Sequence, residues 1–320
     1  MRIVVATHGH CFDGLASATL FSFLARAVES NQALFRYRAC AYGPGQQHPT
    51  PELFDGELNA LLDFQYSPTP KLTWYFDHHV TAFPDVSARL DFEANANSGR
   101  YFLDPTAGSC AKVLGRVITS QFGLALGQLT SLVEHADRID TARYESATDA
   151  IDRSTPISRL VALVERHGDD SFLQRWVPRL LVEPVDVVAN DPEILRDFSQ
   201  IDREQQTFFA HVRDRAETRG AVVYADLTDR VHATLAKFVT YALYPKSTYS
   251  VVLGRIPGAA RLSVGYNPWS GHTRRHNLGE LCQSHGGGGH PVVGGVAFPD
   301  NALDRARSVA LSLVQVLAEG

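Results

Sequence analysis

Apolar runs and amphipathic stretches alternate along the first third of the chain. Residues 2–7 form an apolar run that ends at a cluster of His and Gly, which predicts a buried strand. Residues 14–30 carry apolar side chains at helical spacing, so a helix is expected directly after that strand. Further strands are predicted at 34–42, 58–64 and 71–76, and a helix capped by Ser109 at 110–121. This alternation predicts an α/β fold built on a parallel sheet with helices on both faces.

The pattern changes in the second half of the chain. Residues 155–215 interleave charged residues with Leu and Val, which predicts a largely helical segment. Beyond it, short β-like runs at 221–227, 249–256 and 260–266 surround a helical piece near 230–243, and further helices are predicted at 277–284 and 300–318. We therefore expect a first domain at 1–190, a helical linker at 191–220 and a smaller C-terminal α/β domain at 221–320.

Composition narrows the classes of function. The chain has 320 residues, 44% of them hydrophobic, and a formal net charge of −5, which argues against binding long duplex nucleic acid. No apolar stretch approaches the roughly 20 residues that cross a bilayer, so no membrane partner is expected. The four cysteines are scattered without a CxxC pair, which favours a reducing, cytoplasmic setting over a disulfide framework.

Polar clusters follow three of the predicted strands. They comprise His8 to Asp13, Asp63, and Asp77 to His79. Because ligands bind beyond the carboxyl ends of parallel strands, these side chains should meet in one crevice. Mixed carboxylates and imidazoles suit Mn²⁺, Fe²⁺, Co²⁺ or Zn²⁺. Several carboxylates packed together would repel one another, and a pair of divalent ions would remove that cost.

Five short strings carry a family resemblance. They are THGHCFDG at 7–14, LDFQY at 62–66, FDHH at 76–79, HADRID at 135–140 and GGGGHP at 286–291. In this order they resemble motifs one to four of the DHH phosphoesterase superfamily, followed by the glycine-rich signature of the DHH-associated C-terminal domain. The resemblance spans nearly the whole chain. It implies a DHH domain, a smaller C-terminal domain and an active site in the cleft between them.

The resemblance also implies roles for individual residues. The implied ligands of two divalent ions, commonly Mn²⁺, are His8, Cys11, Asp13, Asp63, His78 and Asp137. Asp63 would bridge both ions, Asp77 would orient His78, and His79 would face the substrate phosphate as a proton donor or charge partner. The two ions together would activate a water for hydrolysis. Substrate contacts from the second domain would come from Gly287, Gly288, Gly289 and His290, with Arg261 and Arg275 as nearby candidates.

The implied substrate is a small phosphorylated molecule, and its nature is left open. Family activities favour a short oligonucleotide, a cyclic dinucleotide or a bisphosphorylated adenosine. The alternatives are hydrolysis of polyphosphate or pyrophosphate, and a nucleotide sensor without catalysis. Many relatives carry an Arg where this chain has Gly265, so phosphate or base recognition must differ here.

Three further points stay open in the sequence. Many relatives have Asp at the position of Cys11, which here is either a soft ligand favouring Zn²⁺ or Fe²⁺ or a small thiol packed beneath the site. Asp140 competes with Asp137 as the ligand of the fourth motif, with the spacing favouring Asp137. The sequence is compatible with either a monomer or a homodimer.

Overall fold

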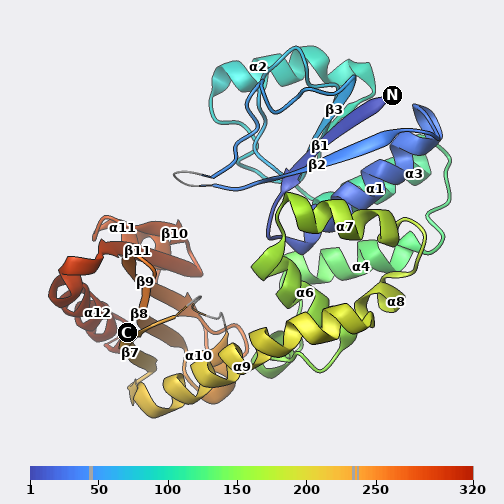
Figure 1. The fold of residues 1–320 in the computed structure, drawn as a ribbon. Coiled ribbons are helices and arrows are strands. Elements are labelled where there is room, and N and C mark those ends of the chain that lie inside the picture. Colours follow the sequence, from blue (N-terminus) through green and yellow to red (C-terminus); the bar gives the residue numbers. More distant parts are fainter. Residues whose placement is uncertain (43–45, 233–234, 236–237, 320) are drawn as a thin grey trace. The chain divides into compact units, whose positions relative to one another are not determined.

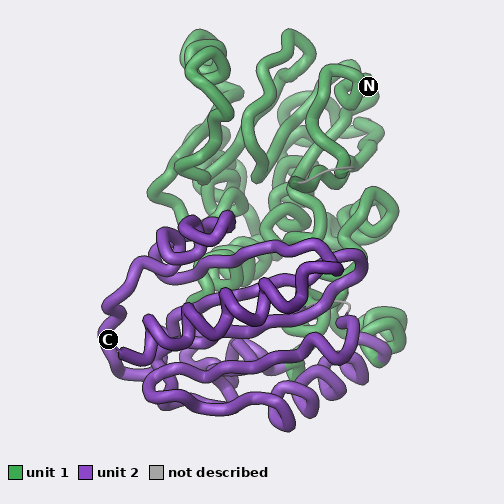
Figure 2. The backbone as a smooth tube through the Cα atoms, turned by 90° about the vertical axis from the view of Figure 1, so that its left-hand side faces the viewer, with its two compact units in different colours: residues 1–143, 153–199 green, residues 144–152, 200–320 purple. Residues whose placement is uncertain are grey.

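The chain forms two compact units in the computed structural model, which describes residues 1–42, 46–232, 235 and 238–319. Unit 1 comprises residues 1–143 and 153–199, and unit 2 comprises residues 144–152 and 200–320 (Figure 2). The longest helix, α9 (Pro192–Arg215), lies partly in each unit, in the stretch that the sequence assigned to a linker. None of the helices in the described ranges is both long enough and apolar enough to cross a membrane.

Unit 1 is built on a five-stranded parallel sheet. Its strands are β1 (Arg2–His8), β2 (Leu34–Cys40), β3 (Leu58–Leu62), β4 (Trp74–Asp77) and β5 (Tyr101–Leu103), in the order β2-β1-β3-β4-β5. β1 lies at the centre of three strands, with Val5 opposite Tyr37 of β2 and Ala60 of β3. The predicted parallel sheet is confirmed, and its carboxyl edge collects the ends of β1, β3 and β4.

Helices cover both faces of this sheet (Figure 1). One layer contains α1 (Phe12–Val28), α3 (Cys110–Ser120), α4 (Leu129–Asp140), α6 (Pro156–His167) and α7 (Asp170–Leu180), with the short α8 (Val185–Ala189) beside it. α1 is almost wholly buried because it packs against β1 and against α3 and α4. The other face is covered by α2 (Val86–Asn95), whose Ala88 joins a core of Leu61, Phe64 and Tyr75. Helices on both faces therefore agree with the sequence prediction.

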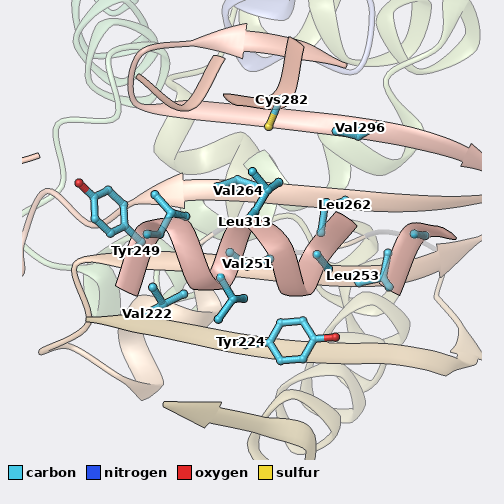
Figure 3. Packing of buried hydrophobic residues seen from close by; sticks show 14 of the residues in the cluster. Val222, Tyr224, Tyr249, Val251, Leu253, Leu262, Val264, Cys282, Val296 and Leu313 are labelled. Atoms are coloured by element: carbon cyan, nitrogen blue, oxygen red, sulfur yellow. The ribbon is translucent and has the colours of Figure 1, made fainter. Parts of the chain in front are cut away.

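Unit 2 is built on a six-stranded mixed sheet. The strands are β6 (Ala216–Arg219), β7 (Val222–Val231), β8 (Tyr249–Ile256), β9 (Ala259–Tyr266), β10 (Gly288–His290) and β11 (Val293–Pro299), in the order β10-β11-β9-β8-β7-β6. Only the pair β7–β8 is parallel among these described strands. α12 (Leu303–Ala318) lies across one face, where its Leu313 packs among Val251, Leu262 and Val264 (Figure 3).

The remaining helices of unit 2 are short. α5 (Ala147–Ile151) and α10 (Val239–Leu243) lie against each other, and α11 (Leu278–Gln283) precedes the glycine run. The helix predicted near 230–243 is wrong at its start, because β7 continues through Val231 as the partner of β8. Residues 233–234 and 236–237 of that prediction lie outside the described residues.

Candidate metal centre

Three polar side chains of the site lie at the carboxyl ends of three neighbouring strands of unit 1. His8 ends β1, Asp63 follows β3 and His78 follows β4. The three strands are parallel and adjacent, so their carboxyl ends meet. His8 Nδ1 lies 3.7 Å from Asp63 Oδ2, and His78 Nε2 lies 3.6 Å from Asp63 Oδ1. The sheet topology alone therefore brings together residues that are far apart in the sequence.

The turn from β1 into α1 depends on Gly14. A Cβ at this position would lie 2.0 Å from the carbonyl oxygen of His8, which no real side chain tolerates. Thr7 Oγ1 donates a hydrogen bond to the Gly14 carbonyl oxygen at 3.0 Å and holds the close approach. Glycine here lets α1 begin immediately after the strand, with Cys11 as the residue that precedes its first turn.

Asp13 connects the site to the start of α3. Its two carboxylate oxygens accept hydrogen bonds from the backbone N–H groups of Cys110 at 2.7 Å and Ala111 at 2.9 Å. The carboxylate thereby satisfies two of the free N–H groups at the helix N-terminus. Asp13 Oδ2 also lies 3.9 Å from His78 Nε2. A buried carboxylate is thus fixed rigidly at the edge of the cluster.

Asp63 occupies the centre of the cluster in an unusual backbone conformation. Its φ is +53°, in the left-handed region that Asp and Asn tolerate better than most residues. The backbone N–H still donates to the Phe76 carbonyl oxygen at 2.9 Å, so the residue stays attached to the sheet. Its Oδ2 faces His8, whereas its Oδ1 lies near His78 and 4.0 Å from His79 Nδ1. The carboxylate therefore reaches both sides of the cluster.

The potential ligand atoms fall into three overlapping groups. Within each group the atoms lie no more than 4.8 Å apart, and the groups are His8, Cys11 and Asp63; Asp63, His78 and His79; and Asp13, His78 and Asp140. Asp63 and His78 each belong to two groups. Oxygen, nitrogen and sulfur donors in this mixture suit a first-row transition ion.

Electrostatics favour a cation among these side chains. Burial raises the pKa of Asp13, and the neighbouring Asp63 and Asp140 carboxylates raise it further. Burial also raises the pKa of Asp140, again reinforced by Asp63. Burial alone would lower the pKa of His78, but Asp63 and Asp13 raise it to about 9. Without a metal the cluster can limit its negative charge only by binding protons, and a divalent ion would replace those protons.

Two buried atoms at the centre have no hydrogen-bond partner among the described residues. They are Asp63 Oδ2 and His78 Nε2, and both face the cluster. His78 donates from its other ring nitrogen, Nδ1, to the Ala107 carbonyl oxygen at 3.3 Å. Metal-binding histidines are commonly held in this way through the nitrogen that does not bind the ion. Because unpartnered buried polar atoms are costly, the residues present fit a bound metal ion.

The fourth motif contributes Asp140 to the cluster rather than Asp137. Asp140 Oδ2 lies 3.4 Å from His78 Nε2. Asp137 instead accepts a hydrogen bond from Lys112 Nζ at 2.9 Å and another from Arg143, and its carboxylate packs against Gly108. The geometry thus differs from the expectation that Asp137 is the ligand, because Lys112 and Arg143 both bind Asp137 Oδ2, although its Oδ1 is buried without a hydrogen-bond partner among the described residues.

This difference can be tested with paired variants. Asp140→Asn should weaken Mn²⁺ binding at least about tenfold, because it removes a charged donor next to His78. Asp137→Asn should instead lower thermal stability slightly, since its cationic partners are largely exposed. Isothermal titration with Mn²⁺ and thermal unfolding of both variants provide the measurement. A larger loss of affinity in Asp137→Asn would reverse the assignment.

Asp77 orients His79, not His78 as expected from the sequence. His79 Nδ1 donates to Asp77 Oδ1 at 2.7 Å, and the Tyr75 hydroxyl lies 3.0 Å from Asp77 Oδ2. This hydrogen bond raises the pKa of His79 although burial opposes it. The difference arises because His78 turns to the carbonyl of Ala107. His79 is thereby held at one nitrogen, and its side chain remains 39% exposed.

Cys11 lies in the group with His8 and Asp63. Burial raises the pKa of its thiol well above the usual range, and Asp63 and Asp13 raise it further. Without a cation the sulfur therefore remains a neutral thiol. Its position is compatible with both roles that the sequence suggests, a metal ligand and a thiol packed beneath the site.

The glycine run lines a cavity of about 290 Å³ within unit 2. Its walls come from α11 with its N-cap and from the run itself, and they include Asn277, Glu280, Gln283, Gly287, Gly288 and Gly289. Gly289 has a φ of +147°, a conformation that other residues rarely adopt. His290 ends β10 with an exposed side chain and does not line this cavity. The structure thus gathers the three predicted glycines into one pocket, without His290.

Gly265 stands where the sequence resemblance implies an Arg, and Tyr241 leaves no room there for a side chain. A Cβ on Gly265 would lie 2.1 Å from the hydroxyl oxygen of Tyr241, which is buried and hydrogen-bonded to Ser250 Oγ at 3.0 Å. Arg261 lies four residues earlier on β9 with an exposed side chain. Arg275 is also exposed, and its backbone N–H donates to the Tyr249 hydroxyl at 2.7 Å. Both arginines belong to unit 2.

Comparisons with known proteins establish the fold. No protein-family model matches the chain, and no curated protein matches it in sequence. Among solved structures, the pGpG-specific phosphodiesterase PggH from Vibrio cholerae matches with a TM-score of 0.67 and 19% identity, over 99% of both chains. The DHH domain of a protein described as belonging to a family of ribosomal proteins matches with a TM-score of 0.61 and 10% identity, over 99% of this chain and 87% of that one. RecJ from Thermus thermophilus in complex with Mn²⁺ matches with a TM-score of 0.60 and 13% identity, over 98% of this chain and 52% of RecJ.

Proposed function

We propose that this chain, which has the fold of the DHH proteins, is a divalent-metal-dependent phosphoesterase that hydrolyses a short nucleotide. The observation that supports this most directly is the pair of buried, unpartnered atoms, Asp63 Oδ2 and His78 Nε2, at the centre of three ligand groups. The fold likeness supports it independently, because it extends over both units.

The ligand groups suggest how two ions would be held. His8, Cys11 and Asp63 would hold one ion, and Asp13, His78 and Asp140 the other, with Asp63 shared. When bound, such ions supply positive charge to the phosphoryl oxygens and lower the pKa of a water molecule. His79 would contribute through its second nitrogen, Nε2, because Asp77 holds Nδ1. A histidine fixed in this way can donate a proton to a phosphate oxygen or to the leaving group.

The substrate proposed is a short linear dinucleotide. PggH is named for its action on pGpG, and it matches this chain over nearly the full length of both. The formal net charge of −5 opposes capture of long nucleic acid, so attraction of phosphate would have to be local. The glycine-lined pocket of unit 2 is suited to bind a phosphate through backbone N–H groups. The active site in a cleft between two domains, which the resemblance implies, stays a prediction.

A metal and substrate panel tests the proposal. Protein stripped with chelator should be inactive, and Mn²⁺ should restore hydrolysis of pGpG to mononucleotides measured by chromatography. The panel would include Mg²⁺, Co²⁺ and Zn²⁺, and as substrates a cyclic dinucleotide, 3′-phosphoadenosine 5′-phosphate and pyrophosphate. Faster release of phosphate from pyrophosphate would favour the alternative of a phosphoanhydride hydrolase. Binding of pGpG without turnover under every metal would instead indicate a sensor.

A further inference from the structure

An exposed aromatic ring lies beside the candidate metal centre. Tyr42 follows the carboxyl end of β2, at the same edge of the sheet as His8 and Asp63. Its ring centroid lies 5.9 Å from that of His8 in an edge-on arrangement. Tyr42 is 55% exposed, whereas its neighbour Phe64 is 1% exposed. An open aromatic surface therefore adjoins one of the proposed metal ligands.

The orientation of this ring is fixed from two directions. Tyr42 stacks on Phe64 with ring centroids 4.3 Å apart and an interplanar angle of 13°. The Tyr42 hydroxyl accepts a hydrogen bond from the backbone N–H of Gln65 at 3.2 Å. Phe64 itself belongs to the core of unit 1, packed with Leu61 and Tyr75. Stacking on Phe64 thus covers one face of the tyrosine, while 55% of the residue remains exposed.

We infer that Tyr42 is the surface on which a nucleobase of the substrate stacks. This inference rests on the proposed function and specifies that the site prefers phosphates attached to a nucleoside. In a nucleotide only the ribose separates the base from the phosphate, so a base next to Tyr42 would place its phosphate at the ligands beside His8. Stacking requires a flat, open and rigid ring, and the contact with Phe64 holds this one in place. Stacking needs no base-specific hydrogen bond, so the site should prefer any phosphate that carries a base over one that carries none. Purines should be preferred over pyrimidines because their flat surface is larger.

The chemistry around the ring favours this use over a purely structural one. A side chain that only shields Phe64 could be any apolar residue, and it would need no polar anchor. Tyr42 instead keeps its hydroxyl bonded at the outer end, which holds the ring flat on Phe64. A ring held in advance loses little conformational entropy when a base stacks on it. The same geometry would position the scissile phosphate more reproducibly.

Two matched ligands separate base stacking from phosphate binding. GMP and ribose 5-phosphate carry the same phosphate, but only GMP has a base. Their affinities for the full-length protein with Mn²⁺ would be measured by isothermal titration. Tyr42→Leu keeps an apolar cover over Phe64 and removes the aromatic face, so GMP should bind about tenfold more weakly. The loss of affinity for ribose 5-phosphate should be smaller than the loss for GMP by a factor of about five or more. The Tyr42→Trp variant should bind GMP at least as well as the unchanged protein.

Controls make the outcome decisive. Leu34→Ala alters an exposed residue at the opposite end of β2 and should leave both affinities unchanged. Equal losses for GMP and ribose 5-phosphate in Tyr42→Leu, or no loss for either, would overturn the stacking role while pGpG hydrolysis by the unchanged protein persists. If the unchanged protein hydrolyses no phosphoester and binds neither ligand, the proposed function and the role of Tyr42 fall together.

Discussion

Asp63→Asn is expected to lower kcat for pGpG by at least about 10³-fold, which corresponds to roughly 4 kcal/mol of transition-state stabilisation. The carboxylate reaches His8 with one oxygen and His78 with the other, so its loss removes negative charge from both sides of the cluster. Asn is the suitable replacement because it keeps the shape and tolerates the φ of +53° at this position. Steady-state kinetics at saturating Mn²⁺ would measure the effect, with bound metal determined by mass spectrometry.

The control for this variant is Asp55→Asn. Asp55 pairs with Arg36 on the surface, and both side chains are nearly half exposed. This change should leave kcat and bound metal unaltered, because exposed ion pairs contribute little. Far-UV circular dichroism of Asp63→Asn should match the unchanged protein. A correctly folded Asp63→Asn that keeps more than about a tenth of the activity would contradict the shared-ligand role.

Gly14→Ala is expected to destabilise unit 1 by about 3 kcal/mol or more, the upper range for forcing an extra methyl into a packed interior. The added Cβ would lie 2.0 Å from the His8 carbonyl oxygen, and backbone atoms cannot yield as a flexible side chain would. Relief requires α1 to shift away from β1, which also displaces His8 and Asp13. We therefore expect a lower unfolding temperature by calorimetry together with weaker Mn²⁺ binding.

Gly115→Ala provides the matched change in another buried helix of the same unit. The atoms nearest to its Cβ would be in the Val133 and Leu126 side chains, at 3.2 and 3.5 Å. Helix propensity favours alanine by up to about 1 kcal/mol, which offsets the tighter packing. The unfolding temperature of this variant should change little. If Gly14→Ala proved as stable as Gly115→Ala, the strand-to-helix turn would not depend on the close approach.

The sequence predicted the parts of the site that follow from sheet topology. His8, Asp63 and His78 stand at or just after the ends of apolar runs, and parallel strands bring such positions to one edge. β5 was not predicted, because a strand of three residues leaves no measurable alternation. The five-stranded sheet could thus be anticipated except for its last strand.

The differences between the predicted site and the observed geometry arise from contacts between distant segments. Asp137 and Asp140 are three positions apart on α4, so they differ by only about 60° around the helix. Which of them faces His78 depends on Lys112 of α3 and on Arg143, which engage Asp137. Tyr42 was not predicted because its partner Phe64 follows a different strand. An aromatic residue just after a strand that ends at the same edge is the signal that could have indicated it.

The closed space at Gly265 makes the residue tolerated at this position depend on the side chain of Tyr241. An Arg at this position would meet the Tyr241 hydroxyl, so it becomes sterically acceptable only after Tyr241 has been shortened. Shortening Tyr241 first removes the hydrogen bond to Ser250 and opens a void in a buried region. Each single substitution is therefore unfavourable alone, and the two are epistatic.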